Sequence, residues 1–150
     1  MTMRRRNIRP RSDVERRLLS YQNAVAEEAL LLERIDRLDS RARALTRQLS
    51  GVPSASGNGM TLPELADERE RLRCGVKRLQ RIKEDALALL AMLPDDERRL
   101  MTAYYVEGLS IERAAEFVPC SRRTAFALKE QALRRLASLD RRPELQNSVE

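Results

Sequence analysis

The chain has 150 residues, of which 35% are charged and only 3% aromatic, with five Gly and no Trp. This composition favours long helices that bury narrow apolar stripes, and it argues against a sheet with a broad aromatic core. No apolar run approaches the roughly 18 residues of a membrane span. The N-terminal arginines lack the apolar segment of a secretory signal.

Cysteine and histidine usage excludes the common zinc sites. The two cysteines, Cys74 and Cys120, are far apart, and the chain has no His. A Cys/His metal site needs several such ligands close together. The chain also lacks a nucleophile–base pair and a nucleotide-binding motif. We therefore expect no metal, no cofactor and no enzymatic activity, and a cytoplasmic protein with reduced thiols.

Positive charge gathers in two segments of the chain. The formal net charge is +6, and all but three of the 29 basic residues are Arg. Residues 1–11, which we expect to be a disordered basic tail, carry five Arg and no acid. Residues 121–139 carry five basic residues against Glu130 alone. Arg binds phosphate and guanine through forked hydrogen bonds, so the pattern is compatible with nucleic acid. A GC-rich coding sequence explains an arginine preference equally well.

The first predicted element is a long helix. Ser12 and Asp13 provide a helix start, and apolar residues then recur mostly at alternating spacings of four and three up to about residue 50. This seam consists of Val14, Leu18, Tyr21, Val25, Leu31 or Leu32, Ile35, Leu38, Ala42, Leu45 and Leu49. Such spacing is typical of the narrow contact line of a coiled coil.

A connector and a second long helix follow. SGVPSASGNG, residues 50–59, predicts a flexible loop, and no Gly-Lys-Ser/Thr follows it as a phosphate-binding loop requires. Thr61 and Pro63 mark a new helix start. The second seam consists of Leu62, Leu65, Leu72, Val76, Leu79, Ala86, Leu90 and Leu93, with Arg69 and Lys83 in two further slots. Residues 12–93 are therefore expected to form an antiparallel helical hairpin with its loop at 50–60.

Apolar residues beside the second seam predict additional packing. Ile82, Leu87 and Leu89 lie next to the seam rather than in it. Because an isolated hairpin hides only one stripe of each helix, we expect these side chains to pack against a second chain or against the C-terminal part of this one.

Residues 94–139 predict three short helices. Three acids after Pro94 suit the positive end of a helix dipole. Gly108 is expected to stop that first helix, and Ser110 to cap a short one over 111–117. After the break at VPC, Ser121 caps the last helix. Short helices with a tight turn between the final two describe a helix-turn-helix unit.

The remaining aromatic residues and the C-terminal end complete the expected fold. Tyr104, Tyr105 and Phe117 are predicted to lie in the core of the small domain. Residues 140–150 are expected to form a flexible tail. The fold class that results is all-α, a long antiparallel helical hairpin (coiled-coil-like) followed by a small three-helix helix-turn-helix domain.

Several short motifs occur in one ungapped run over residues 93–136. They are LP-x-x-ER, Y-x-EGLS, the Ala114-Ala115 pair, SRRT, and AL-x-x-L. This segment resembles region four of bacterial sigma factors. The resemblance implies that the last helix binds promoter DNA near −35, with RNA polymerase or activators contacted elsewhere. Nothing in the chain resembles sigma region two, so a complete initiating sigma factor is not expected.

The last helix is expected to have a buried face and a DNA-facing face. The buried face has helical spacing and comprises Ala125, Leu128, Ala132 and Leu136, with Ala115 as the small surface that faces them. Base contacts concentrate in the first turn of a recognition helix. Arg122 and Arg123 are therefore expected to reach guanine, each contact worth roughly 1–3 kcal/mol of discrimination. Ser121 and the nearby N–H groups are expected to bind a phosphate.

Further residues complete the predicted DNA-binding surface. Phe126, Ala127 and Glu130 are expected to face outward. Phe126 and Ala127 stand where region four commonly has polar base-contacting side chains, so they either meet a thymine methyl group or weaken base reading. Pro119 likewise replaces a glycine often found in the turn. For the other basic residues, the sequence is equally compatible with contact to DNA phosphates and with a role as solvated surface. These residues are Arg113, Lys129, Arg134 and Arg135.

The two halves together indicate a class of function. A helical hairpin with an SGVP loop, followed by a region-four-like unit, is similar to small phage-encoded sigma-like activators. The sequence therefore predicts a transcriptional regulator of phage or prophage origin that binds double-stranded DNA. Its hairpin would mediate self-association or contact RNA polymerase. Two alternatives stay open: a DNA-packaging recognition protein similar to a phage terminase small subunit, and a polymerase-binding adaptor that never binds DNA.

Overall fold

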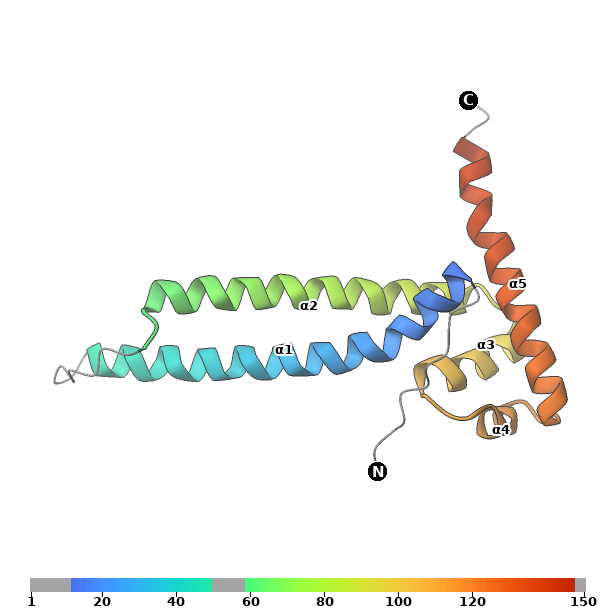
Figure 1. The fold of residues 1–150 in the computed structure, drawn as a ribbon, viewed down its shortest axis with the longest axis horizontal. Coiled ribbons are helices and arrows are strands. Elements are labelled where there is room, and N and C mark those ends of the chain that lie inside the picture. The colour runs from blue at the N-terminus through green and yellow to red at the C-terminus, as the bar shows by residue number, and fades with distance from the viewer. Residues whose placement is uncertain (1–11, 50–58, 148–150) are drawn as a thin grey trace. The chain divides into compact units, whose positions relative to one another are not determined.

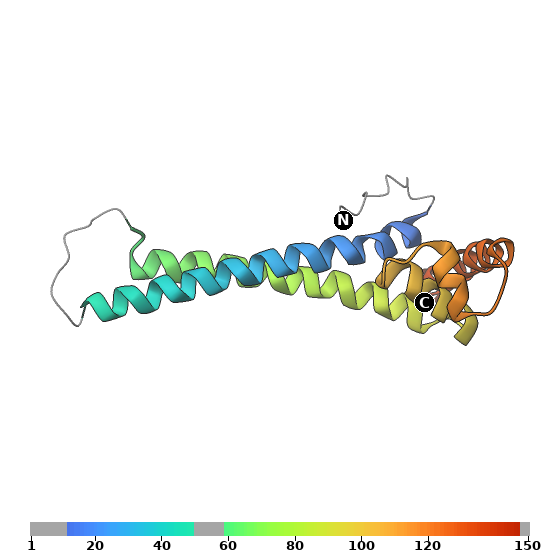
Figure 2. The same cartoon turned by 90° about the horizontal axis from the view of Figure 1, so that it is seen from below.

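Every regular element in the described part of the chain is a helix. The computed structural model describes residues 12–49 and 59–147. Its elements are α1 (Asp13–Leu49), α2 (Leu62–Ala91), α3 (Asp95–Met101), the π-helical turn η1 (Thr102–Val106), α4 (Ile111–Ala114), the 3-10 turn η2 (Ala115–Phe117) and α5 (Arg122–Asn147). Helices α1 and α2 run side by side in opposite directions, and the smaller helical domain follows (Figure 1, Figure 2). The predicted all-α fold is confirmed.

Some of the predicted segments lie outside the described residues. These are the basic tail at 1–11, most of the connector (50–58), including its SGVP motif, and residues 148–150. The expected flexible tail at 140–150 differs from the structure over its first part, because α5 continues as a helix to Asn147. At the start of this stretch, the carboxylate of Asp140 accepts a hydrogen bond from the guanidinium of Arg17 at 3.0 Å.

The described chain forms two compact units. Unit 1 combines residues 12–23 with residues 82–147, and unit 2 is Ala24–Arg81. The sequence predicts a domain boundary after residue 93, between the hairpin and the helix-turn-helix. The compact units instead divide the hairpin itself. The reason is that Val14 and Leu18 share one apolar core with Leu136 of α5.

Unit 2 is held together by the predicted seam. The most deeply packed residues of its core are Leu38, Leu65 and Leu72, with Leu31, Ile35, Ala42, Leu45 and Met60 half-buried around them. Arg69 occupies a seam slot, and its guanidinium forms an ion pair with Asp39 at 3.0 Å. The contact line between the two helices therefore includes this charged pair.

The seam prediction was wrong at two positions of α1. Val25 is 43% exposed, and its neighbour Ala24 is buried instead. The seam advances by three residues from Tyr21 to Ala24 rather than by four, which is a local departure from the heptad step. Leu49 is also exposed, at the last position of the helix. Between Leu31 and Leu32, the structure buries the former more deeply.

Unit 1 contains two apolar clusters that α5 joins. One cluster includes Leu18, Leu90 and Leu136, and the other packs Leu100 and Ala125 with residues of α4. Three of the four predicted inward positions of α5 are fully buried, and Leu128 is half-buried at the edge of the second cluster. The predicted inner face of α5 is therefore confirmed, and it spans both clusters.

The apolar residues beside the α2 seam differ in burial. Leu89 is buried in the first cluster of unit 1, to which residues of α1 and α5 also belong, so it is covered within the same chain. Leu87 is 44% exposed.

Among the described residues, no helix is long and apolar enough to cross a membrane.

Candidate nucleic-acid interface

Two serine caps and a short turn position the start of α5. The N–H of Arg113 donates to Ser110 Oγ at 3.3 Å, and the N–H of Thr124 donates to Ser121 Oγ at 3.2 Å. Both predicted caps are therefore present. Between the two helices, Val118 is buried and anchors the turn. The caps and this anchor fix where the first turn of α5 begins.

The segment before this turn departs from a simple helix. After α3 the chain continues as the π-helical turn η1, and Gly108 follows with φ +73°. That backbone conformation favours glycine, so Gly108 does act as the predicted stop. Phe117 was predicted to lie in the core but is 52% exposed. It belongs to the 3-10 turn η2, whose three residues per turn shift side chains away from α-helical positions.

The predicted base-reading residues share one exposed side of α5. Ser121, Arg122, Arg123 and Ala127 are exposed, and Phe126 is 43% exposed. Ala125, between them in the sequence, is completely buried against α4. Because residues three and four apart lie on the same side of a helix, the exposed group forms a continuous surface over the first two turns. This surface carries two arginines, and an α-helix is narrow enough to enter a major groove.

Arg122 already has two neighbours on this surface. Its Nε lies 3.1 Å from Oε1 of Glu112, on α4, and its guanidinium carbon lies 5.6 Å from the centre of the Phe126 ring. Both partners of the ion pair are more than half exposed, so the pair adds little to stability. The pair instead orients Arg122 from the supporting helix.

The other residues predicted to contact DNA are more scattered. Lys129 is half-buried, and its Nζ lies 4.5 Å from the centre of the Tyr104 ring, so it packs against η1. Glu130 is also half-buried, whereas Arg113 on α4 and Arg134 further along α5 are exposed. The predicted residues of the first two turns of α5 therefore lie together, whereas Lys129 packs against η1.

An ion pair that sequence reasoning missed ties α5 to α3. The carboxylate of Glu97 is buried and accepts two hydrogen bonds from Arg135, at 3.0 and 3.2 Å. The sequence contains a signal for the buried acid, although not for its partner. Glu97 lies four residues after Leu93 and three before Leu100, so helical spacing places an acid on the apolar face. Arg135 thus holds α5 against α3.

A second ion-pair cluster joins α5 to both hairpin helices within unit 1. The guanidinium of Arg17 donates two hydrogen bonds to Asp85, at 2.6 and 2.8 Å, and one to Asp140 at 3.0 Å. These hydrogen bonds lower the pKa of the Asp85 carboxyl below its ordinary value of 3.8. The hydrogen bond from Arg17 is the largest contribution, and burial opposes it. Arg17 therefore connects α1, α2 and α5.

The core beneath the interface contains a buried tyrosine. Tyr105 is 2% exposed, and its ring meets that of Tyr104 edge to face with centroids 4.8 Å apart. Burial raises the pKa of the Tyr105 hydroxyl, and the nearby carboxylate of Glu15 raises it further. The hydroxyl therefore stays neutral, and both tyrosines are packing residues as predicted.

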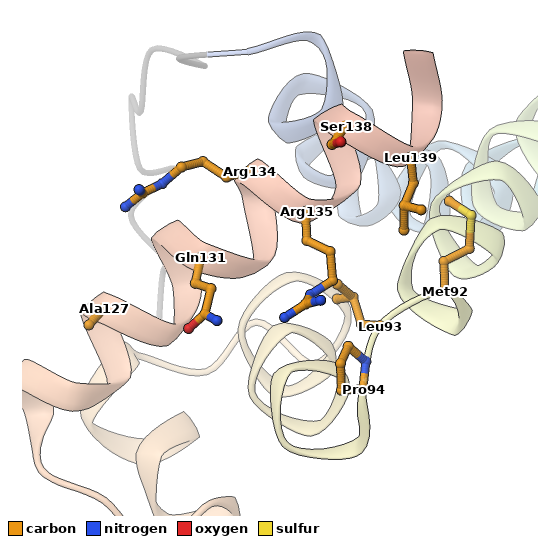
Figure 3. A pocket seen from close by; sticks show the side chains of 9 residues that line it. All are labelled: Met92, Leu93, Pro94, Ala127, Gln131, Arg134, Arg135, Ser138 and Leu139. Atoms are coloured by element: carbon orange, nitrogen blue, oxygen red, sulfur yellow. The ribbon is translucent and has the colours of Figure 1, made fainter. Parts of the chain in front are cut away.

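An open groove lies on the flank of α5, beside the junction of α2 and α3 (Figure 3). Its lining residues are Met92, Leu93, Pro94, Ala127, Gln131, Arg134, Arg135, Ser138 and Leu139. The lining combines apolar side chains with two arginines, and Arg135 points toward the α2–α3 junction. Ala127 and Arg134, both predicted to contact DNA, thus also face this groove.

The described geometry is that of a helix-turn-helix, in which α4 supports α5 and the start of α5 is exposed. A family model described as Sigma-70, region 4 matches residues 83–136. This match begins near the end of α2 and ends within α5, so the C-terminal half contains a domain similar to sigma-70 region 4. No curated protein and no solved structure matches the chain.

Proposed function

We propose that this chain is a transcriptional regulator that reads promoter DNA with α5. One observation supports the proposal above the others. The segment similar to sigma-70 region 4 contains the α4–turn–α5 arrangement, and it carries Arg122 and Arg123 exposed in the first turn of α5. Region 4 is a promoter-binding domain, and the first turn of its last helix is where base contacts occur.

The proposed roles follow from the chemistry of each side chain. Arg122 and Arg123 donate to O6 and N7 of guanine, while Phe126 and Ala127 contact thymine methyl groups. Ser121 and the free N–H groups at the start of α5 hold a backbone phosphate. Arg113 and Arg134 contact phosphates on either side, and such contacts contribute affinity without sequence information.

The test is a double substitution in the first turn of α5. The preferred site is identified by footprinting on the genome that encodes the chain, and affinity is measured by fluorescence anisotropy. Arg122→Ala/Arg123→Ala is expected to weaken binding to that site at least about 30-fold, since each lost contact costs roughly 1–3 kcal/mol. The control is Arg34→Ala/Arg43→Ala, which removes two exposed arginines from α1. Equal affinities of the α5 variant and the parent would overturn the proposal.

RNA polymerase is the second partner that we propose. The groove beside α5 supports it, because apolar floor residues next to arginines suit an acidic amphipathic segment. Met92 is 45% exposed there, so Met92→Glu should leave the fold intact. We expect this variant to lose capture of the host polymerase while it keeps DNA affinity. Unchanged capture would place the polymerase contact elsewhere.

The origin and assembly of the protein remain part of the proposal. Phage or prophage origin is favoured by the combination of a helical hairpin with a region-four-like unit. Self-association through the hairpin is favoured by Leu87, which lies beside the α2 seam and is 44% exposed. Light scattering tests the alternative of a DNA-packaging protein. A ring-sized assembly would favour packaging, whereas a monomer or dimer favours the regulator.

A further inference from the structure

The outer face of α2 carries a run of positive charge that the helix-turn-helix does not use. Residues 71–83, RLRCGVKRLQRIK, contain six basic side chains and no acid. Five of the six are exposed and lie within unit 2. We name them the α2 basic stripe: Arg71, Arg73, Lys77, Arg78 and Arg81.

Helical spacing gathers these five residues on one side. Arg73, Lys77 and Arg81 follow one another at steps of four, and Arg71 and Arg78 are seven apart. Residues at these steps share a helix face. The opposite face of the same stretch is the seam, where Leu72, Val76 and Leu79 are at most 8% exposed. At a rise of about 1.5 Å per residue, the stripe is roughly 15 Å long.

The charge of the stripe is largely uncompensated. Among the described residues, its one ion pair joins Arg71 to Glu68 at 3.8 Å, with Arg71 80% exposed. Helix α1 differs between residues 33 and 41, where acids and arginines alternate and one pair, Arg37–Glu33, is 2.7 Å apart. Unit 2 therefore presents a cationic face on α2 and a mixed face on α1.

We propose that the α2 basic stripe is a second DNA-contacting surface, which binds backbone phosphates without reading sequence. Duplex DNA carries one negative charge per roughly 1.7 Å of axis, so a row of cations about 15 Å long faces several phosphates at once. Between Arg71 and Arg81, the exposed residues outside the stripe are Cys74 and Gln80, whereas Leu72, Val76 and Leu79 are buried in the seam. A membrane-surface helix needs exposed apolar residues beside its cations, so the lipid alternative is disfavoured.

The test neutralises the stripe in the full chain. Arg73→Gln/Lys77→Gln/Arg78→Gln/Arg81→Gln removes four charges, and Arg34→Gln/Arg37→Gln/Arg41→Gln/Arg43→Gln removes four from α1 as a charge-matched control. Affinity for a non-specific duplex is measured as salt is varied, with helix content checked by circular dichroism. The stripe variant should lower the salt slope of log K by about 3 to 4, at about 0.9 per lost phosphate contact. The control should change it by less than about 1.

The outcomes separate this proposal from the proposed function of α5. The stripe variant is expected to weaken specific and non-specific binding by the same factor, so the ratio of the two affinities is kept. Arg122→Ala/Arg123→Ala should reduce the ratio of specific to non-specific affinity. It should not change the part of the salt slope that the stripe contributes. Equal slopes for the stripe variant and the α1 control would overturn the proposal. So would a stripe variant that loses binding to phosphatidylserine vesicles but keeps its parent's affinity for DNA.

Discussion

In the proposed DNA complex, Glu112 and DNA would compete for the guanidinium of Arg122. In the free protein that guanidinium lies 3.1 Å from the Glu112 carboxylate, and in our proposal it must turn to guanine. Breaking an exposed pair costs about 0–1 kcal/mol, and Glu112 also repels nearby phosphates. Glu112→Gln is therefore expected to tighten DNA binding by about two- to five-fold, measured as Kd at constant salt.

A charge-matched substitution provides the control for this prediction. Glu116, on η2, is exposed and has the same charge as Glu112. Glu116→Gln should tighten binding less than Glu112→Gln, because it releases no base-reading side chain. Equal effects of the two substitutions would show that net charge alone explains the gain.

Gly108 is the second residue on which the interface depends. It has φ +73°, and a Cβ there would lie 2.3 Å from Nε2 of Gln22. We expect Gly108→Ala to lower the free energy of unfolding by about 1–2 kcal/mol through the backbone cost alone. Urea denaturation measures this loss. Gly59→Ala is the control, since no atom lies within 4 Å of its Cβ position. Adding Gln22→Ala to Gly108→Ala should recover only the part of the lost unfolding free energy that comes from the contact with Gln22.

At the scale of elements, Arg17 and Asp85 make stability depend on acid pH. The folded-state pKa of Asp85 lies below its ordinary 3.8 because Arg17 donates hydrogen bonds to the carboxylate. The carboxylate therefore stabilises the fold above about pH 4, and this contribution is lost as pH falls through the folded-state pKa. Asp85→Asn should be less stable than the parent at pH 7, and the difference should narrow below pH 3.8.

Urea denaturation at pH 7, 4.5 and 3 checks this expectation. Asp67→Asn serves as the control on the same helix, because Asp67 is exposed; its stability should stay close to that of the parent at pH 7. A difference between Asp85→Asn and the parent that stayed constant down to pH 3 would contradict the role assigned to Arg17.

The elements were predictable where one rule determined them. Alternating apolar spacing gave the seams of α1 and α2, and serine side chains gave both caps of the helix-turn-helix. The π-helical turn η1 was not predictable, since a shift in hydrogen bonding leaves no mark on residue type. Phe117 was misplaced for a similar reason, because the 3-10 turn changes the periodicity on which its burial was inferred. Val25 was expected in the seam because alternating spacing places it four residues after Tyr21, whereas the seam advances by three residues there and buries Ala24.

The candidate site was predictable in part. Residue type and helical spacing predicted that the start of α5 is exposed, including Arg122 and Arg123. Pairings between distant residues were not predictable, because they depend on tertiary contact: Glu97 with Arg135 and Arg122 with Glu112 are both of this kind.

At the scale of the molecule, the two compact units should differ in how they respond to core cavities. Leu72 belongs to the core of unit 2, and Leu136 to that of unit 1. Replacing a buried Leu by Ala typically costs 2–5 kcal/mol. Leu72→Ala should lower amide hydrogen-exchange protection mainly within unit 2, and Leu136→Ala mainly within unit 1, in both of its segments, residues 12–23 and 82–147. Uniform loss of protection in both variants would show that the chain opens as one cooperative body.

The composition of unit 1 also constrains the order in which the protein can fold on the ribosome. Val14 and Leu18 of α1 are synthesised more than a hundred residues before their partner Leu136. Unit 2, made in between, has both of its helices available much earlier, so its seam can close while α5 is still being translated. The DNA-reading unit would then be the last part to mature, and the nascent chain would hold no competent recognition helix until that point.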